Sequence, residues 1–282
     1  MLTETYYIIT IKNRQFYYKE SIFEINNKKN ITASLGGDTT YCVVVAIYED
    51  NPTVAYIDIV EYDSRCAKDI LLEHKDGTFD LVTTALWTIH TRFPSIKVFT
   101  LKDDSHILCE EGSKKYKLNL AYESILKYGK TWYQYRFNAT LSDSLLSTFY
   151  DSQHILDKPL DDINFQASRG ASYLLPYKSI YTNSKSPRDF FKNLREKYQK
   201  RYCHEVYQWI KKYMDLLNIK LYSDSWFITT ETLNPPQNYT IIKTAKNIRG
   251  GMKKRKTRRA NLYTVRNTTD NVGSIVGIYE NF

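Results

Sequence analysis

Alternation of hydrophobic and polar positions opens the chain and predicts β-strands. Residues 5–18 alternate and contain a polar turn at Asn13-Arg14, so they predict a strand pair or a single bent strand. Residues 41–48 form a nearly continuous apolar run, and residues 53–62 alternate again. The residues between these two segments are typical of a tight turn, so the segments predict an antiparallel hairpin.

The hydrophobic period changes to that of a helix after residue 77. Between residues 78 and 93 one face collects Phe79, Val82, Leu86, Ile89 and Phe93. This spacing predicts a helix that Pro94 ends. Residues 96–101 then predict a buried strand, and residues 117–128 predict a second helix that stops at Gly129.

The pattern is weaker beyond residue 142, where we expect a polar connection up to about residue 185. Ser186-Pro187-Arg188-Asp189 combines a capping serine, a proline at the first helical position and an aspartate in the first turn. These residues predict the start of a helix or helix pair that runs to about residue 217. A strand is expected within residues 221–229, and residues 262–279 regain a strand-like alternation.

This order of elements predicts an α/β (α+β) protein. We expect a mixed, largely antiparallel sheet with packed helices, followed by a mainly helical C-terminal extension and a basic, locally disordered tail. The predicted domains are an α/β domain at 1–141, a helical extension with an added strand at 142–240, and a tail with a terminal strand-like segment at 241–282.

The composition predicts a globular chain that does not need disulfides or metal ions to fold. It has 282 residues, of which 42% are hydrophobic and 25% charged. The four cysteines lack metal-ligand spacing, so we expect buried free thiols and no metal. We find neither a secretory signal pattern nor an apolar run of about 18 residues, which predicts an intracellular protein without a membrane span.

Most of the net charge of +9 lies in one short segment. Residues 249–259 hold seven basic residues and no acidic one. Within this segment, the candidate phosphate contacts are Lys253, Lys254, Arg255, Lys256, Arg258 and Arg259. Such a run attracts nucleic acid without sequence preference, and its four consecutive basic residues also fit a nuclear import signal. The alternative is a solvated tail that binds nothing.

Two short polar motifs have both a functional and a structural interpretation. Lys75-Asp76-Gly77-Thr78 precedes the first helix, so its backbone N–H groups could bind a pyrophosphate, or it could be an ordinary capped connection. Asp103 and His106 follow a strand, where they could act in acid/base chemistry or bind a metal, or could form a polar turn.

Two passages carry a resemblance to a known group of proteins. FPSIKVFTLKDDSHILC at 93–109 and LKYGKTWYQYRFNATL at 126–141 resemble uncharacterised proteins of nucleocytoplasmic large DNA viruses. The order of predicted elements resembles the Gcn5-related N-acetyltransferase (GNAT) fold, with the match covering residues 70–141 best. A viral source implies a location in the host cytoplasm or nucleus, or in the virion.

The GNAT resemblance implies acetyl-CoA as the cofactor. In GNAT enzymes a comparable glycine turn holds the pyrophosphate, which implies cofactor-binding roles for Lys75, Gly77 and Thr78. Tyr122 or Tyr128 would correspond to the tyrosine that protonates the departing thiolate. Asp76 and Phe79 depart from the family motif and predict that the coenzyme binds weakly or not at all, because an acidic side chain opposes an anion and a bulky one hinders its approach.

Two functions therefore follow from the sequence. The first is an N-acetyltransferase-like protein of a large DNA virus, with catalysis either retained or lost. The alternative is a virion-associated structural or nucleic-acid-binding protein that uses its basic tail. The expected partners of the tail are nucleic acid or an import receptor.

Overall fold

The structure of the chain is a computed structural model that describes residues 2–37, 40–60, 64–67, 74–103, 105–111, 114–160, 171–219 and 226–244. These residues form two compact units. Unit 1 combines the described residues up to 103 with residues 226–244, and unit 2 comprises those from 105 to 219. The first boundary in the structure thus falls after residue 103, whereas the sequence pattern suggested a boundary after residue 141.

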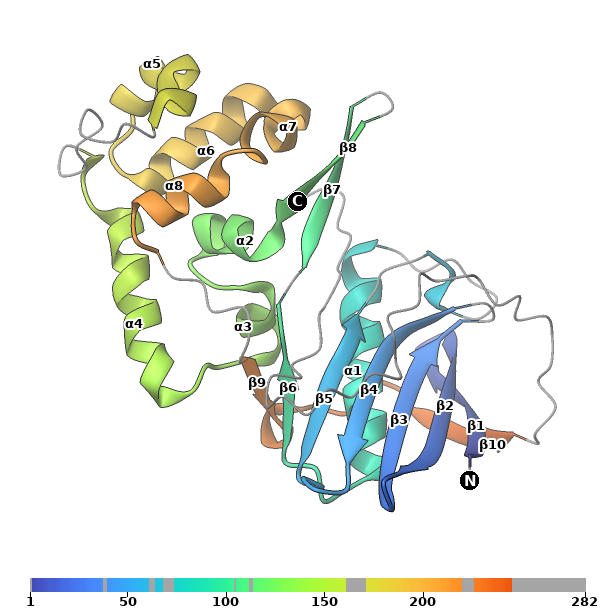
Figure 1. Cartoon of the computed structure of the whole chain (residues 1–282). Coiled ribbons are helices and arrows are strands. Elements are labelled where there is room, and N and C mark those ends of the chain that lie inside the picture. The colour runs from blue at the N-terminus through green and yellow to red at the C-terminus, as the bar shows by residue number, and fades with distance from the viewer. Residues whose placement is uncertain are drawn as a thin grey trace. The chain divides into compact units, whose positions relative to one another are not determined.

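Unit 1 is built on one eight-stranded open sheet (Figure 1). The strands are β1 Thr3–Ile11, β2 Arg14–Ile25, β3 Lys28–Gly36, β4 Tyr41–Tyr48, β5 Val54–Val60, β6 Val98–Leu101, β9 Trp226–Thr229 and β10 Thr240–Thr244. Their order across the sheet is β10-β1-β2-β3-β4-β5-β6-β9. All neighbours pair antiparallel except β5 and β6, which are parallel. The expected mixed, largely antiparallel sheet is therefore confirmed.

Strand alternation gives the sheet one buried face, and α1 (His74–Arg92) packs there. Ile9, Phe16 and Val45 on the strands are fully buried, as are Leu81, Val82, Leu86 and Ile89 on the helix. Each such side chain contributes about 1.5–3 kcal/mol when it leaves water. The predicted helix is confirmed, although it begins four residues earlier than the pattern suggested.

Ion pairs tie α1 to the β1–β2 hairpin near both ends of the helix. Near the start, the carboxylate of Asp80 accepts a hydrogen bond from Lys12 at 3.1 Å and pairs with Arg14. At the end, Arg92 Nε donates to the buried Glu20 at 2.7 Å. These long-range pairs fix the rotation of the helix on the sheet, because both carboxylates are nearly excluded from solvent.

Unit 2 begins with a two-stranded sheet and continues with short helices. The strands are β7 His106–Glu111 and β8 Lys114–Asn119. The α-helices are α2 Leu120–Tyr128, α3 Trp132–Phe137, α4 Asp143–His154, α5 Lys178–Thr182, α6 Pro187–Tyr198, α7 Tyr202–Val206 and α8 Ile210–Leu216. The 3-10 turns are η2 Ile155–Asp157, η4 Ala171–Tyr177 and η5 Gln199–Arg201.

Side-chain caps and aromatic packing explain these short helices. The predicted cap at Ser186 is confirmed, since its hydroxyl accepts a hydrogen bond from the backbone N–H of Asp189 at 3.2 Å. The helices bury an aromatic cluster in which Phe191 lies 5.6 Å from Trp209 and 5.3 Å from Tyr213, measured between ring centroids. Tertiary packing therefore stabilises helices that would be marginal alone.

Several sequence expectations were wrong at the level of single elements. Residues 114–119 form β8, and the helix expected from residue 117 begins at Leu120 because Asn119 caps it. β3 was missed, and the expected polar connection after Ser142 contains α4. The single helix or helix pair of 186–217 is broken into α6, η5, α7 and α8. The strand-like segment at 262–279 and the basic tail lie outside the described residues.

The expectation of free thiols was also wrong. Cys42 pairs with Cys66 in unit 1, and Cys109 pairs with Cys203 in unit 2, with Cα–Cα distances of 5.8 and 5.9 Å. Both distances lie in the range that a disulfide requires. Tertiary structure brings these residues together over separations of 24 and 94 residues, so no local spacing could indicate the pairing.

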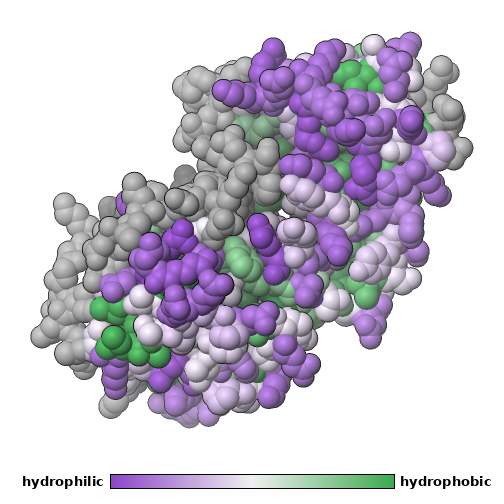
Figure 2. Space-filling model, turned by 180° about the vertical axis from the view of Figure 1, so that it is seen from behind, coloured by the Kyte–Doolittle hydropathy of each residue, from purple (hydrophilic) through white to green (hydrophobic). Residues whose placement is uncertain are grey.

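Hydrophilic side chains dominate the face of the helical unit seen in Figure 2. Among the helices that the structure describes, none is both long and apolar enough to cross a membrane.

Candidate functional site

The carboxyl ends of the parallel strands β5 and β6 define the part of unit 1 in which a site is expected. Both strands end at this edge, and α1, which connects them, begins there. A strand–helix–strand unit places the carboxyl ends of two strands beside the amino end of a helix. In α/β sheets ligands commonly bind at this end of the strands.

Pairing between β5 and β6 stops before β5 ends. The parallel register runs from Val54↔Val98 to Ile57↔Leu101, and β5 continues through Asp58 and Ile59 to Val60. The last part of β5 therefore extends past the end of β6. Its backbone groups on that side form a strand edge.

A β-bulge lies at the point where the pairing with β6 ends. On β4, Val45 pairs with Ile57, whereas its neighbour Val44 pairs with Ile59. Asp58 is thus the extra residue of the bulge. Bulges re-aim a side chain and are common next to active sites.

Asp58 is a half-buried carboxylic acid in an otherwise apolar strand. Burial raises its pKa above the ordinary aspartate value. Tyr48 and Tyr56 form a ring pair at 5.4 Å, and the pKa of Tyr48 is raised by burial and, to a smaller extent, by the charge of Asp58. A carboxylate with a raised pKa is a better general base than an exposed one.

The connection between β5 and α1 is fixed to the sheet in two ways. The disulfide joins Cys66 of this connection to Cys42 at the start of β4. In addition, a Cβ on Gly37 would lie 1.8 Å from the carbonyl oxygen of Arg65 and 2.8 Å from that of Ala67. Only glycine permits this backbone approach, so the close contact of Gly37 with residues 65–67 depends on the missing side chain.

The predicted cofactor residues lie at this edge but not in a turn. Lys75, Gly77 and Thr78 belong to the first turn and a half of α1, which begins at His74. Gly77 and Thr78 are buried, and the side chain of Lys75 lies outside the described residues. The amino end of α1 could still meet an anion with its backbone N–H groups. Their role in coenzyme binding stays a prediction.

The predicted catalytic tyrosines both lie on α2 in unit 2. Tyr122 is half-buried, and burial raises its pKa. Tyr128 is 49% exposed, and its ring stacks on Tyr135 at 6.2 Å. The sequence candidates for cofactor binding and for catalysis are therefore divided between the two units, and the catalytic role of the tyrosines stays a prediction.

The other residues that the sequence singled out, Asp103, His106 and the basic segment, do not form a site among the residues that the structure describes. Asp103 and His106 are both buried, and they belong to different units. The basic residues 253–259 lie outside the part of the chain that the structure describes. Within the described residues, no three His, Cys, Asp or Glu side chains gather in a way that could hold a metal ion.

Comparisons of the chain with protein-family models, with curated proteins and with solved structures found no match. The function therefore has to be inferred from the geometry of the chain itself.

Sequence reasoning placed Asp58 in the correct strand but assigned it no role. The signal was present, because Asp58 is a single acidic residue in the strand VAYIDIV, close to the point where the chain leaves the sheet. The bulge and the early end of β6 pairing could not be foreseen, since both depend on the register between strands.

Proposed function

We propose that unit 1 binds an acyl-coenzyme A at the carboxyl end of β5 and β6, and transfers its acyl group to an amine. One observation supports this most directly: the pairing between the two strands ends at Ile57–Leu101, beside a bulge that carries Asp58. The crossover from a parallel strand through α1 agrees with the GNAT resemblance of the sequence.

The part of β5 that continues beyond its pairing with β6 suits the coenzyme chemically. An extended chain that contains amides can bind to a strand edge through backbone hydrogen bonds, and the pantetheine arm of coenzyme A is such a chain. The amino end of α1 lies at the same edge and would meet the pyrophosphate. The disulfide and Gly37 hold this arrangement before a ligand arrives, which lowers the entropic cost of binding.

Asp58 would act as the general base of the transfer. The amine nitrogen attacks the thioester carbonyl carbon, a C–N bond forms, and the C–S bond breaks to release the coenzyme thiolate. Asp58 accepts the proton that the nitrogen loses, and the thiolate takes up a proton from solvent or from an acid.

Binding is expected to be weak because the start of α1 carries acidic residues. Asp76 lies in the first turn, and Asp80 follows one turn later. An acidic side chain at the amino end of a helix competes with a bound anion for the same partial positive charge. We expect a Kd of about 0.2 mM for acetyl-CoA, equivalent to about −5 kcal/mol.

The test is release of free thiol from acetyl-CoA by the full chain, with a panel of small amines as acceptors. Asp58→Asn preserves side-chain size and should lower the rate about 10²–10⁴-fold, with coenzyme affinity unchanged. Asp50→Asn is the matched control, because Asp50 follows the far end of β4 and pairs with Lys28 in solvent. Absence of saturable acetyl-CoA binding, or an Asp58→Asn variant as active as the wild type, would refute the proposal.

A further inference from the structure

A cationic pocket lies in unit 2, where the end of α2 meets the start of α6. Its volume is about 380 Å³, within the size range of small-molecule sites. Four of its seven lining residues are basic: Lys127, Arg188, Lys192 and Arg195. Asp189 is the acidic residue of the lining. The proposed acyltransferase site does not involve this pocket.

Arg188 is held rigidly beside the pocket. Its Nε and Nη2 donate to the two carboxylate oxygens of Asp157 at 2.6 and 3.1 Å. Its Nη1 donates to the carbonyl oxygens of Ile125 and Leu126 at 2.6 and 3.1 Å. The bonds to the carbonyl oxygens give acceptor groups in the last turn of α2 a hydrogen-bond partner, so Arg188 offsets the partial negative charge at that helix end.

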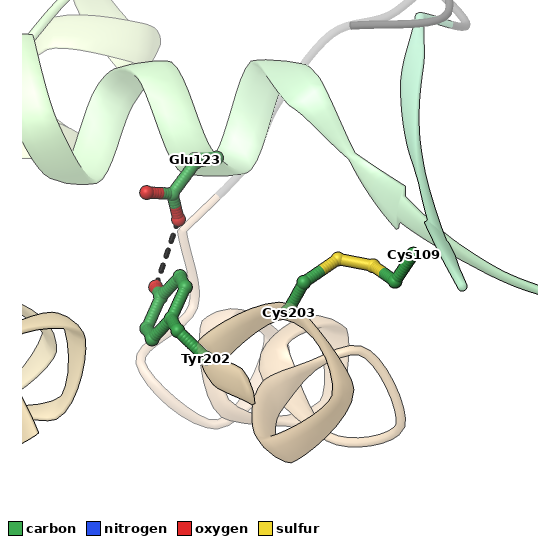
Figure 3. Close-up of a disulfide and its surroundings, with 4 residues drawn as sticks. All are labelled: Cys109, Glu123, Tyr202 and Cys203. Carbon is green, nitrogen blue, oxygen red and sulfur yellow. Dashed lines mark hydrogen bonds between the residues drawn. A yellow bond between two sulfur atoms is a disulfide. The ribbon is translucent and has the colours of Figure 1, made fainter. Parts of the chain in front are cut away.

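Arg195 is fixed by a buried carboxylate. Its Nη1 donates to Glu123 at 2.8 Å. The hydroxyl of Tyr202 donates to the other oxygen of Glu123 at 2.8 Å (Figure 3). Tyr202 adjoins Cys203, whose disulfide to Cys109 anchors α7 to β7. Neither Glu123 nor Asp157 is among the lining residues, so the carboxylates that orient the two arginines do not line the cavity.

Asp189 takes part in the cap of its own helix and keeps its negative charge. Its carboxylate accepts a hydrogen bond from the backbone N–H of Lys185 at 2.9 Å, while Ser186 caps Asp189 in return. Lys192 lies 3.9 Å from Glu196, and both side chains are 65% exposed, which makes this pair weak. Four basic side chains and Asp189 give the lining a formal charge of 4 − 1 = +3, and counting Glu123 and Asp157, which pair with the two arginines, leaves 3 − 2 = +1. The formal charge at the pocket is therefore still positive.

From these contacts we infer that the pocket binds the phosphate group of a small soluble phosphorylated ligand. Arg188 has one N–H left after its four hydrogen bonds, and Arg195 has those of Nε and Nη2. Together with the ammonium group of Lys192 they offer charge-assisted hydrogen bonds, which are about twice as strong as neutral ones. Ser186 at the start of the 12-residue α6 also lines the pocket, but Asp189 in the first turn offsets the partial positive charge of that helix end. The ligand class is set by this charge and by the pocket volume.

The test uses pyrophosphate and inorganic phosphate as probes, in calorimetric titrations of the full chain. The decisive variant is Ser186→Asp, because aspartate caps a helix as well as serine does but places a negative charge in the pocket. We expect saturable pyrophosphate binding by the wild type and an affinity at least about tenfold lower in Ser186→Asp. Lys192→Ala should weaken binding in the same direction, since it removes a charged contact.

Two controls separate the pocket from other basic surface. Lys197→Ala removes an exposed lysine of the same helix that does not line the pocket, and it should bind like the wild type. Deletion of residues 249–259 should also leave pyrophosphate binding intact. Equal affinity in Ser186→Asp and the wild type, or no saturable binding at about 10 mM probe, would overturn the inference.

Discussion

The two units contain the same buried polar arrangement in different settings. In unit 1, Glu20 is 4% exposed and binds Arg92 at 2.7 Å, and Arg92 also donates to Tyr7 at 2.5 Å. In unit 2, Glu123 is 5% exposed and binds both Arg195 and Tyr202 at 2.8 Å. Both are carboxylate–arginine–tyrosine clusters.

The two clusters differ in the secondary-structure elements that they connect. Glu20 lies on a 12-residue strand paired on both sides, so its cluster adds orientation to an element that the sheet already fixes. Glu123, Arg195 and Tyr202 lie on three short helices, α2, α6 and α7, for which such long-range bonds and one disulfide replace a hydrogen-bonded ladder. Unit 2 should therefore depend more on single polar and covalent links than unit 1.

Removal of the two disulfides should show this difference most strongly. The loop between Cys109 and Cys203 spans 94 residues and that between Cys42 and Cys66 spans 24. In the chain-entropy model these loops correspond to about 4.7 and about 3.4 kcal/mol. Urea unfolding of Cys109→Ser and Cys66→Ser should follow this order. Under reducing conditions the variants and the wild type should have similar free energies of unfolding. A larger loss of stability in Cys66→Ser than in Cys109→Ser would contradict the comparison.

Deletion of residues 249–259 tests whether polyanion binding belongs to the tail rather than to either unit. With five or six phosphate contacts, the logarithmic salt slope for duplex DNA should be near −5, a roughly thousandfold loss of affinity between about 50 and 200 mM salt. The deletion should abolish DNA binding and leave the melting temperature unchanged. DNA binding that survives would place the interface on a folded unit instead.

Neutralising the two buried glutamates compares the clusters directly. Glu123→Gln and Glu20→Gln each leave an arginine without its carboxylate, which costs about 3–5 kcal/mol for a buried pair. Glu123→Gln should be the more damaging, because Arg195 is 20% exposed and Arg92 is 38% exposed. Thermal or urea unfolding measures the loss of stability in both variants. Asp215→Asn, which removes an exposed pair with Lys211, is the control and should cost less than about 1 kcal/mol.

Asp58→Asn should instead stabilise unit 1 at neutral pH. Burial raises the folded-state pKa of Asp58 above its unfolded value, so the folded state binds the proton more tightly. The free energy of unfolding then falls as pH rises from the unfolded pKa through the folded one, and remains lower above it. The melting temperature of Asp58→Asn should be higher than that of the wild type near pH 7. At about pH 3 the two melting temperatures should be equal. A less stable variant near pH 7 would mean that the Asp58 carboxylate is stabilised by partners.

The sequence was most informative where periodicity and burial agree. The β1–β2 and β4–β5 hairpins, α1, β6 and the cap at Ser186 were all predicted, because each has a local signal in alternation, helical spacing or capping chemistry. β3 was missed because it follows a tight turn in which Asn26 and Asn27 adopt positive φ, and because it begins with the polar residues Lys28, Lys29 and Asn30.

The candidate site was harder to predict because it depends on long-range geometry. The glycine motif at residues 75–78 was predicted as a turn that precedes the first helix, whereas it lies inside α1. The bulge at Asp58, the approach of Gly37 to Arg65 and the pairing of Cys42 with Cys66 arise only when distant segments meet. The cationic pocket similarly joins residues of α2 and α6, which are about 60 positions apart.

The most direct test of the proposed function is hydrogen–deuterium exchange of the full chain with and without saturating acetyl-CoA. The proposal predicts slower exchange of backbone amides at residues 57–60 of β5 and 74–78 of α1, because these groups would bind the pantetheine arm and the pyrophosphate. Peptides covering residues 186–192 of the cationic pocket should show less protection than either segment. Unchanged exchange at residues 57–60 under saturating coenzyme, or protection confined to unit 2, would contradict the proposed acyl-coenzyme site.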